Sequence, residues 1–425
     1  MAPFQGCDTD DEAYELIPAE LVLETTHLVA YQDSAQRESS PVDSASIRRM
    51  SDYYAAYGSP VIDDYFGGVS DIDENGKIVV FVTEIPPDIS EDAAAVVLAR
   101  DLYRRSDSDS ECAASNEAEM TYFSASVIQD MEGSTPSFQA LSTLVHEVKH
   151  ISSLGHRIEA DIGTHPSWIE EGTADIAAEI SSRLAWADSG GAAVGETMTR
   201  SSFPDNSSFN AANWGVLIRL ARLANTLSSQ PNALTDDPTA ADAGHTFYGS
   251  SWHFHRFLGD AYYGGMLQDS EFFRKQNTSS TAVGVEFLES ELGASLQDLE
   301  EELVLATMAN GTPSESSVAR GFTGYEFPSA AEIFCVPNPL GVYPWTVTTS
   351  GDPDPGNCDE GYDPGAETQD PSASFVDATY GGSVGAGGVR VYEFESDGSG
   401  DGIDVEVSIG SVSSGEARVV VFRVQ

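Results

Sequence analysis

Lysine is nearly absent from this 425-residue chain, and basic residues as a whole are scarce. Its lysines are Lys77, Lys149 and Lys275, and 20 Lys+Arg stand against 69 Asp+Glu, which gives a formal net charge of −49 at pH 7. A surface this acidic repels phosphate backbones and anionic lipid headgroups, so we expect no nucleic acid and no anionic membrane among the partners. The charge favours solubility in a saline environment, and carboxylate loops that bind calcium are the alternative.

Long hydrophobic runs are also missing. The chain has no uninterrupted apolar stretch of roughly 18 residues, which predicts that it does not insert into a membrane. The N-terminal sequence MAPFQGCDTDDEAYE has neither the basic nor the apolar segment of a signal peptide. A secreted protein with this sequence is therefore expected to be a form whose leader has been removed.

Cysteine is limited to four residues, and none of them forms a C-x-x-C pair. A zinc site built from thiolates is therefore not expected. Cys335 and Cys358 flank a loop rich in proline, glycine and aspartate, where a disulfide would suit an exported protein. The other two are Cys7 and Cys112.

The texture of the chain changes once, near residue 335. Before that point, apolar residues recur at helical spacing or in short β-branched runs, and beyond it the sequence becomes rich in Pro, Gly and Asp and then alternates as short strands. We therefore predict an α+β domain followed by a small all-β module. The predicted parts are an N-terminal segment (1–24), the main domain (25–335), an acidic Pro/Gly-rich linker (336–370) and the β module (371–425).

Within the main domain, strands and helices are predicted from periodicity and from their capping residues. The predicted strands are 26–34, 77–82 (KIVVFV) and 119–128. The predicted helices are 43–58, ended by Gly58; 134–155, capped by Ser134 or Thr135 and ended by Gly155; 165–187; and about 211–226, 246–263, 268–276 and 285–309.

The stretch LVHEVKHISSLGH, residues 144–156, contains the pattern H-E-x-x-H. His146 and His150 are four residues apart and lie on one face of the predicted helix, so both imidazoles can bind one zinc ion. Glu147 then lies beside a water held by the metal and can accept its proton. Lys149 occupies one of the two middle positions, which are often uncharged, and we expect it to face solvent.

A catalytic zinc needs a third protein ligand, and the sequence offers two candidates. His156 occupies the last position of the metzincin pattern H-E-x-x-H-x-x-G-x-x-H, but Ser153 stands where that pattern has its turning glycine. Glu171 lies 21 residues after His150, near the start of the next predicted helix. Asp175, four residues further on the same face, is placed to accept a hydrogen bond from a ligand histidine and fix its tautomer. These features favour Glu171 over His156.

The segment WIEEGTAD, which contains Glu171, resembles the W-L-N-E-G motif of gluzincin metallopeptidases. The wider set of motifs resembles the hyicolysin-like neutral zinc metallopeptidases of bacteria, over roughly residues 25–310. Two positions depart from the pattern, namely Glu170 where the motif has Asn, and Lys149 in the zinc helix. The segments that carry the resemblance are DIDENGKIVVFV, MTYFSAS, LVHEVKH, WIEEGTADIAAE and FYGSSWHFHRFLGDAYYG.

The resemblance implies a zincin-like fold, in which a mixed sheet lies over the H-E-x-x-H helix, its edge strand binds substrate and a mainly helical subdomain lies below. It also implies a secreted or cell-surface zinc endopeptidase that acts on protein or peptide substrates. Zn²⁺ would polarise the scissile carbonyl and its water, Glu147 would carry the proton to the leaving amine, and a further donor would stabilise the oxyanion. His245 and Tyr248 are the candidates for that donor. The other aromatic residues of the segment are expected to pack in a helix: Trp252, Phe254 and Phe257.

The hexapeptide DIDENG has the D-x-D-x-N-G start of an EF-hand loop, with oxygen donors at Asp71, Asp73 and Asn75. A strand rather than a helix is predicted to follow, and the twelfth position is Val82 instead of glutamate. A tight Asn-Gly hairpin turn accounts for the same residues. Ca²⁺ is therefore the weaker of the two interpretations here. The acidic stretch 352–365 is interpreted as a solvated linker, with calcium binding as the weaker alternative.

Two other functions are open. A zinc aminopeptidase shares the W-x-x-E-G motif, although no G-x-M-E-N-like amine-binding motif precedes the zinc helix. The other is a surface adhesion or binding protein that uses the β module and has lost catalysis, but the intact Glu147 argues against it. The sequence leaves the oligomeric state undetermined.

Overall fold

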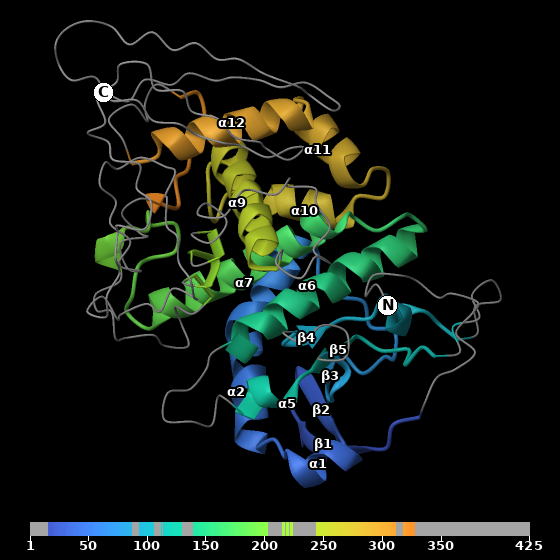
Figure 1. Cartoon of the computed structure of the whole chain (residues 1–425). Helices are drawn as coiled ribbons and strands as arrows, with labels where there is room; N and C mark the ends of the chain where they lie inside the picture. Colours follow the sequence, from blue (N-terminus) through green and yellow to red (C-terminus); the bar gives the residue numbers. More distant parts are fainter. Residues whose placement is uncertain are drawn as a thin grey trace, which may run out of the picture.

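A sheet and a set of helices packed against it make up the part of the chain that the structure describes (Figure 1). The predicted linker and β module, together with Cys335 and Cys358, lie outside the described residues. The computed structural model describes residues 16–86, 93–105, 112, 114–129, 139–202, 215–216, 218–220, 222–223, 244–311 and 318–327.

Five strands form one mixed sheet in the order β1-β2-β3-β5-β4. The three central strands run parallel, and the edge strands β1 and β4 are each antiparallel to their neighbour. β1 lies within residues 1–24, which the sequence predicts to be outside the main domain. The strands are β1 (Ala19–Glu24), β2 (Leu28–Asp33), β3 (Ile78–Val82), β4 (Ala95–Val96) and β5 (Met120–Phe123).

Both faces of this sheet are buried. Ile78, Val80 and Val82 of β3 pack in the main hydrophobic core, whereas Val79 and Phe81 pack in a smaller cluster on the opposite face. Successive residues of a strand point to opposite faces, so a continuous apolar run is typical of a strand that is covered on both sides. The predicted buried strand is confirmed.

Helices make up the rest of the described fold, and α6, the H-E-x-x-H helix, lies between the sheet and α7 (Figure 1). The α-helices are α1 (Ser34–Ser39), α2 (Ser44–Tyr53), α3 (Ser59–Phe66), α5 (Ala125–Gln129), α6 (Gln139–Ala160), α7 (Ser167–Asp188), α9 (Gly244–Tyr263), α10 (Ser270–Thr278), α11 (Gly284–Leu292) and α12 (Leu296–Ala309). A π-helical turn, η1 (Tyr54–Gly58), and two 3₁₀ turns, η2 (Ala99–Leu102) and η4 (Arg200–Ser202), complete the list.

Two glycines expected to end helices lie inside them instead. The helix expected to end at Gly58 continues through η1 into α3 and ends at Gly67, where φ is 85°. A Cβ on Gly58 would lie 2.9 Å from Val145, so this glycine permits the close approach of the helix to α6. Gly155 continues α6, and a Cβ there would lie 2.9 Å from the hydroxyl of Ser70. Both glycines therefore serve close packing rather than chain reversal.

Other predicted boundaries also differ. The single helix expected over 285–309 is divided into α11 and α12 at Gly293, where φ is 69°. The strand expected over 119–128 ends at Phe123, and α5 follows it. The prediction that aromatic residues of α9 pack in the core is confirmed, because these side chains are fully buried: Trp252, Phe254 and Phe257.

The crossing of α7 and α9 depends on Gly172. A Cβ at this position would lie 2.4 Å from Nδ1 of His255 and 2.8 Å from the carbonyl oxygen of Ser251. The glycine of the W-x-x-E-G motif thus lets α9 lie directly against the turn of α7 that carries Glu171. This contact brings Tyr248 of α9 to the candidate site.

Candidate metal centre

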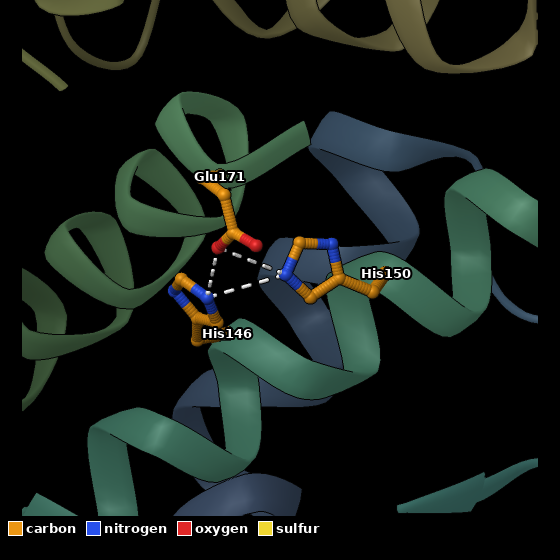
Figure 2. A group of neighbouring side chains, drawn as sticks. All are labelled: His146, His150 and Glu171. Carbon is orange, nitrogen blue, oxygen red and sulfur yellow. Dashed lines mark hydrogen bonds and ion pairs between the residues drawn. The ribbon is translucent and has the colours of Figure 1, made fainter. Parts of the chain in front are cut away.

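Two neighbouring helices bring three donor side chains together (Figure 2). His146 and His150 lie one turn apart on α6, and Glu171 comes from the start of α7. The Nε2 atom of His146 lies 3.0 Å from Oε2 of Glu171 and 3.2 Å from Nε2 of His150. The same carboxylate oxygen lies 3.4 Å from Nε2 of His150. The structure therefore places the three predicted metal ligands within contact of one another.

The spacing of these donor atoms fits a tetrahedral metal ion. Zinc–ligand bonds of about 2.0–2.1 Å at tetrahedral angles separate neighbouring donors by about 3.3 Å, close to the observed 3.0, 3.2 and 3.4 Å. Lone pairs that converge on one point repel one another unless a cation lies between them. Two histidines and one carboxylate also leave a fourth position for water or substrate, as in catalytic zinc sites. The donor set therefore suits Zn²⁺.

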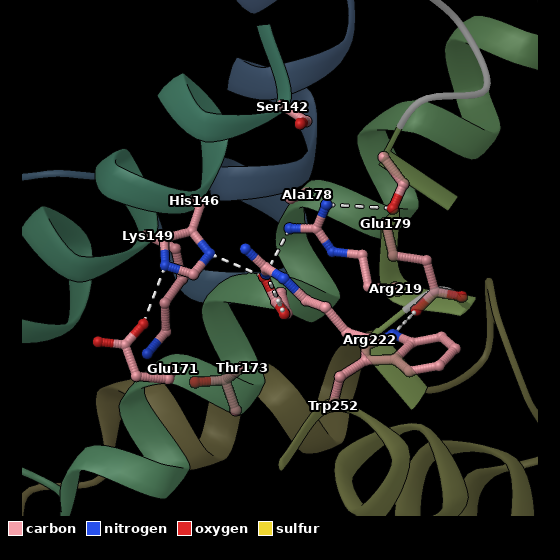
Figure 3. Close-up of polar contacts among 12 residues, drawn as sticks. Ser142, His146, Lys149, Glu171, Thr173, Ala178, Glu179, Arg219, Arg222 and Trp252 are labelled. Carbon is pink, nitrogen blue, oxygen red and sulfur yellow. Dashed lines mark hydrogen bonds and ion pairs between the residues drawn. The ribbon is translucent and has the colours of Figure 1, made fainter. Parts of the chain in front are cut away.

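Asp175 lies behind His146 and is held by two arginines, Arg219 and Arg222. Figure 3 shows both arginine side chains on one side of the His146 ring. The Oδ1 atom of Asp175 lies 3.0 Å from Nδ1 of His146 and accepts a hydrogen bond from Arg219 at 2.5 Å, and Arg222 donates to Oδ2 at 3.2 Å. Burial alone would raise the pKa of Asp175, but Arg219 and Arg222 outweigh it and hold this pKa well below its ordinary value. The charged carboxylate of Asp175 is therefore placed to accept a hydrogen bond from Nδ1 of His146. This bond would fix the tautomer of the imidazole.

The cluster favours a bound positive charge. Burial opposes protonation of His150, but Glu171 and Glu170 outweigh it and raise the pKa of His150 from 6.5 to about 9. Burial would likewise raise the pKa of Glu171, but the two histidines lower it to about 2. At neutral pH the cluster thus holds a proton, and a metal ion that binds there replaces this proton with its own charge.

Glu147 follows His146 on α6, and its side chain is buried. Burial raises the pKa of this carboxyl above its ordinary value, although His146 and His150 act in the opposite direction. A carboxylate with a raised pKa accepts a proton from water more readily at neutral pH. The environment of Glu147 therefore suits the predicted general base.

Tyr248 lies beside the cluster. Its ring centroid is 6.2 Å from that of His146, and the guanidinium carbon of Arg222 lies 4.7 Å from the Tyr248 ring centroid. The charge of Glu171, followed by burial, raises the pKa of Tyr248 well above its ordinary value, so its hydroxyl keeps a proton to donate. His245, the other candidate donor, belongs to the first turn of α9, and its side chain is outside the described part of the chain.

The other two residues singled out on α6 do not belong to the group of three donors. His156 has its ring beside Gly67, where an added Cβ would lie 3.1 Å from Nε2, and it does not belong to the cluster. Lys149 was expected to face solvent, and that expectation is wrong: its side chain is 1% exposed and donates to Glu170 at 2.7 Å. The reason is that α7 packs over the face of α6 that carries Lys149, so this side chain does not reach solvent.

The DIDENG loop joins α3 to β3, so it is not the hairpin turn that the sequence suggests. Backbone amides within the loop already bind its side chains: Gly76 donates to Asp71 at 2.9 Å, and Lys77 donates to Asn75 at 2.6 Å. The fold adds Glu119, which comes within metal-binding distance of Asp71 and Asp73. Calcium binding at Asp71, Asp73 and Asn75 stays a prediction.

Sequence reasoning missed the residues that support the ligands. Arg219 and Arg222 are three residues apart on the predicted helix 211–226, and this R-x-x-R spacing on one face is a signal that can be read from the sequence. Glu119 carries no such signal, because only the parallel pairing of β3 with β5 brings it near the loop. The contact of Lys149 with Glu170 has no local sequence signal either, because it depends on how α6 packs against α7.

In the part of the chain that the structure describes, no helix combines the length and apolar character needed to cross a membrane. A scan against protein-family models gives no match. A search of the curated proteins likewise finds none that is similar in sequence. The geometry and chemistry of the site are thus what bear on function.

Proposed function

We propose that the chain is a zinc-dependent endopeptidase of the gluzincin type with a zincin fold. The observation that carries the proposal is the convergence of His146, His150 and Glu171 at donor separations that suit zinc. The buried Glu147, with its raised pKa, adds the base that hydrolysis needs. A purely structural zinc site has four protein ligands and needs no such base.

Each residue has a role in this account. His146, His150 and Glu171 hold the metal, and Asp175 fixes the orientation of His146. Zinc bound there supplies a Lewis acid that polarises a peptide carbonyl and makes water easier to deprotonate. Glu147 takes the proton from that water and passes it to the leaving amine. Tyr248 donates a hydrogen bond to the oxygen on which negative charge develops.

The sheet supports the same proposal through β4. This strand lies at the edge of the sheet, antiparallel to β5, and it packs against α6. An extended peptide can add to such an edge through backbone hydrogen bonds, which favours binding without strict dependence on side chains. A peptide held on β4 would run beside the helix that carries Glu147.

Export from the cell is part of the proposal. Cys112 takes part in a disulfide, and the structure gives no free cysteine among the described residues. Disulfides persist mainly in oxidising compartments. The disulfide therefore favours an extracellular or cell-surface location, in keeping with an enzyme that digests protein.

The test is hydrolysis of casein by the wild-type protein and by Glu147→Gln, with and without a chelator. We expect chelation to abolish activity and added zinc to restore it. Glu147→Gln should retain zinc and lose about 10²- to 10⁴-fold in rate, because it keeps the shape of the side chain but cannot accept the proton. Full activity of Glu147→Gln would show that hydrolysis does not proceed in this way.

A further inference from the structure

Three side chains of α6 converge on the buried carboxylate of Glu170. Lys149 donates from Nζ to Oε2 at 2.7 Å, and Ser153 donates from its hydroxyl to Oε1 at 2.7 Å. His150 presents Nδ1 to Oε2 at 3.6 Å. Lys149 also reaches the backbone carbonyl oxygen of Glu170 at 3.3 Å. Both carboxylate oxygens of Glu170 are therefore held by hydrogen bonds, and the carboxylate faces Nδ1 of His150. Nε2, on the other side of the same ring, faces His146 and Glu171.

The buried Lys149–Glu170 ion pair is expected to contribute little net stability to the fold. Both side chains are almost completely buried, at 1% and 0% exposure. The desolvation of two charges commonly equals or exceeds their attraction, so apolar residues of similar size would stabilise the fold at least as well. Lys149 and Glu170 are also the two positions at which the sequence departs from the metallopeptidase motifs that it resembles. In the structure these two side chains contact each other. A contact this costly points to a purpose other than stability.

We propose that Lys149 is a positioning residue that acts through Glu170 to fix the orientation of His150. The arrangement parallels the one behind His146, where Arg219 and Arg222 hold Asp175. Each ligand histidine thus has a carboxylate behind its Nδ1, and each carboxylate is held by basic side chains. This inference rests on the proposed function, because it takes His150 to be a zinc ligand.

The test is a double-mutant cycle with Lys149→Met, Glu170→Gln and the double variant. The readouts are the zinc Kd, measured by competition with a chromogenic chelator, and the visible absorption spectrum of the Co²⁺-substituted protein. Loss of an outer hydrogen-bond partner of a ligand commonly weakens metal binding about 10- to 100-fold. We expect Lys149→Met to weaken zinc binding by about tenfold and shift the Co²⁺ spectrum when Glu170 is present. In the Glu170→Gln background the same change should have little further effect.

Two further variants guard against misfolding as an explanation. Ser153→Ala removes one anchor of Glu170 without changing any charge, so it should fold and show a smaller weakening of zinc binding with a spectral shift of the same sign. Tyr122→Phe is the matched control, because it removes a hydrogen bond to the buried carboxylate of Asp101 on the other face of the sheet. It should lower thermal stability and leave the zinc Kd and the Co²⁺ spectrum unchanged.

The outcomes separate this inference from the proposed function. A zinc Kd within twofold of wild type in both Lys149→Met and Ser153→Ala would overturn it. So would a loss of equal size from Lys149→Met in both backgrounds, since Lys149 would then not act through Glu170. A wild-type protein that binds no zinc, or a Glu171→Ala variant that binds it normally, would instead defeat the proposed function itself.

Discussion

The ring of Tyr248 lies against His146 and Arg222, and this position determines what its removal should do. We expect Tyr248→Phe to lower the rate of peptide hydrolysis by about 10²- to 10³-fold, the usual cost of one oxyanion donor. Its zinc Kd should not change, because the phenolic oxygen is not one of the proposed ligands. Steady-state kinetics and chelator competition measure the two quantities.

Tyr263→Phe is the matched control for that experiment. Tyr263 lies at the far end of the same helix, where its hydroxyl donates to Glu291 at 2.7 Å. Its substitution should leave the hydrolysis rate near the wild-type value. Equal losses in both variants would mean that Tyr248 acts through the stability of α9 rather than on the substrate.

The charge on His150 gives a second prediction. The pKa of His150 is raised from 6.5 to about 9, so its protonation stabilises the metal-free fold fully below about pH 6.5. This contribution is lost as the pH rises through about 9. Calorimetry in chelator should therefore show Tm falling between these pH values. The zinc-loaded protein should lack this fall, because the metal has replaced the proton.

A Tm that stays constant or rises over that range in chelator would contradict the stated environment of His150. The His150→Asn variant provides the control, since an amide does not titrate there. Its metal-free Tm should depend less on pH than that of the wild type.

Single residues also show what sequence can and cannot predict. Local spacing alone predicts His146, Glu147 and His150 as candidate site residues, because one helix holds all three. Glu171 needs the next helix as well, yet its motif is specific enough to predict it. Lys149 is the opposite case. Its charge suggested exposure, and only the packing of α7 against α6 shows that its partner is Glu170.

At the scale of helices and strands, the contact of α7 with α9 is the feature most sensitive to a small substitution. Gly172→Ala would place a Cβ 2.4 Å from His255 and force the two helices apart. We expect this variant to lose about 1–3 kcal/mol of stability, the usual cost of overpacking. Hydrolysis should fall as well, because α9 carries Tyr248. Denaturant unfolding and steady-state kinetics measure the two effects.

Gly163→Ala is the matched control, because a Cβ there meets nothing within 4 Å. It should change neither stability nor activity. If Gly172→Ala were equally neutral, the close approach of α9 to α7 would not be what positions Tyr248.

Prediction at this scale succeeds where periodicity dominates and fails where glycine has two uses. The buried strand β3 and the long helix α6 follow from their hydrophobic patterns. Gly58 and Gly155 were expected to end helices, but both permit close contacts within or beside a continuing helix. Those contacts involve residues distant in sequence, so no local pattern distinguishes the two uses of glycine.

At the scale of the whole molecule, the net charge of −49 should make stability depend on salt. Repulsion among carboxylates disfavours the compact state, and screening relieves it as the Debye length falls from about 10 Å at 0.1 M to about 3 Å at 1 M salt. We expect the Tm of the zinc-loaded protein to rise over this range of NaCl. An uncharged osmolyte at equal osmolality is the control, and an equal rise with it would argue against charge repulsion.

The central claim, that His146, His150 and Glu171 bind a catalytic zinc, is tested most directly by the zinc content of purified variants. Elemental analysis after dialysis should find one zinc per chain in the wild type and in His156→Ala. Glu171→Ala should have lost it. Zinc retained in Glu171→Ala and lost in His156→Ala would contradict the claim and assign the third ligand to His156.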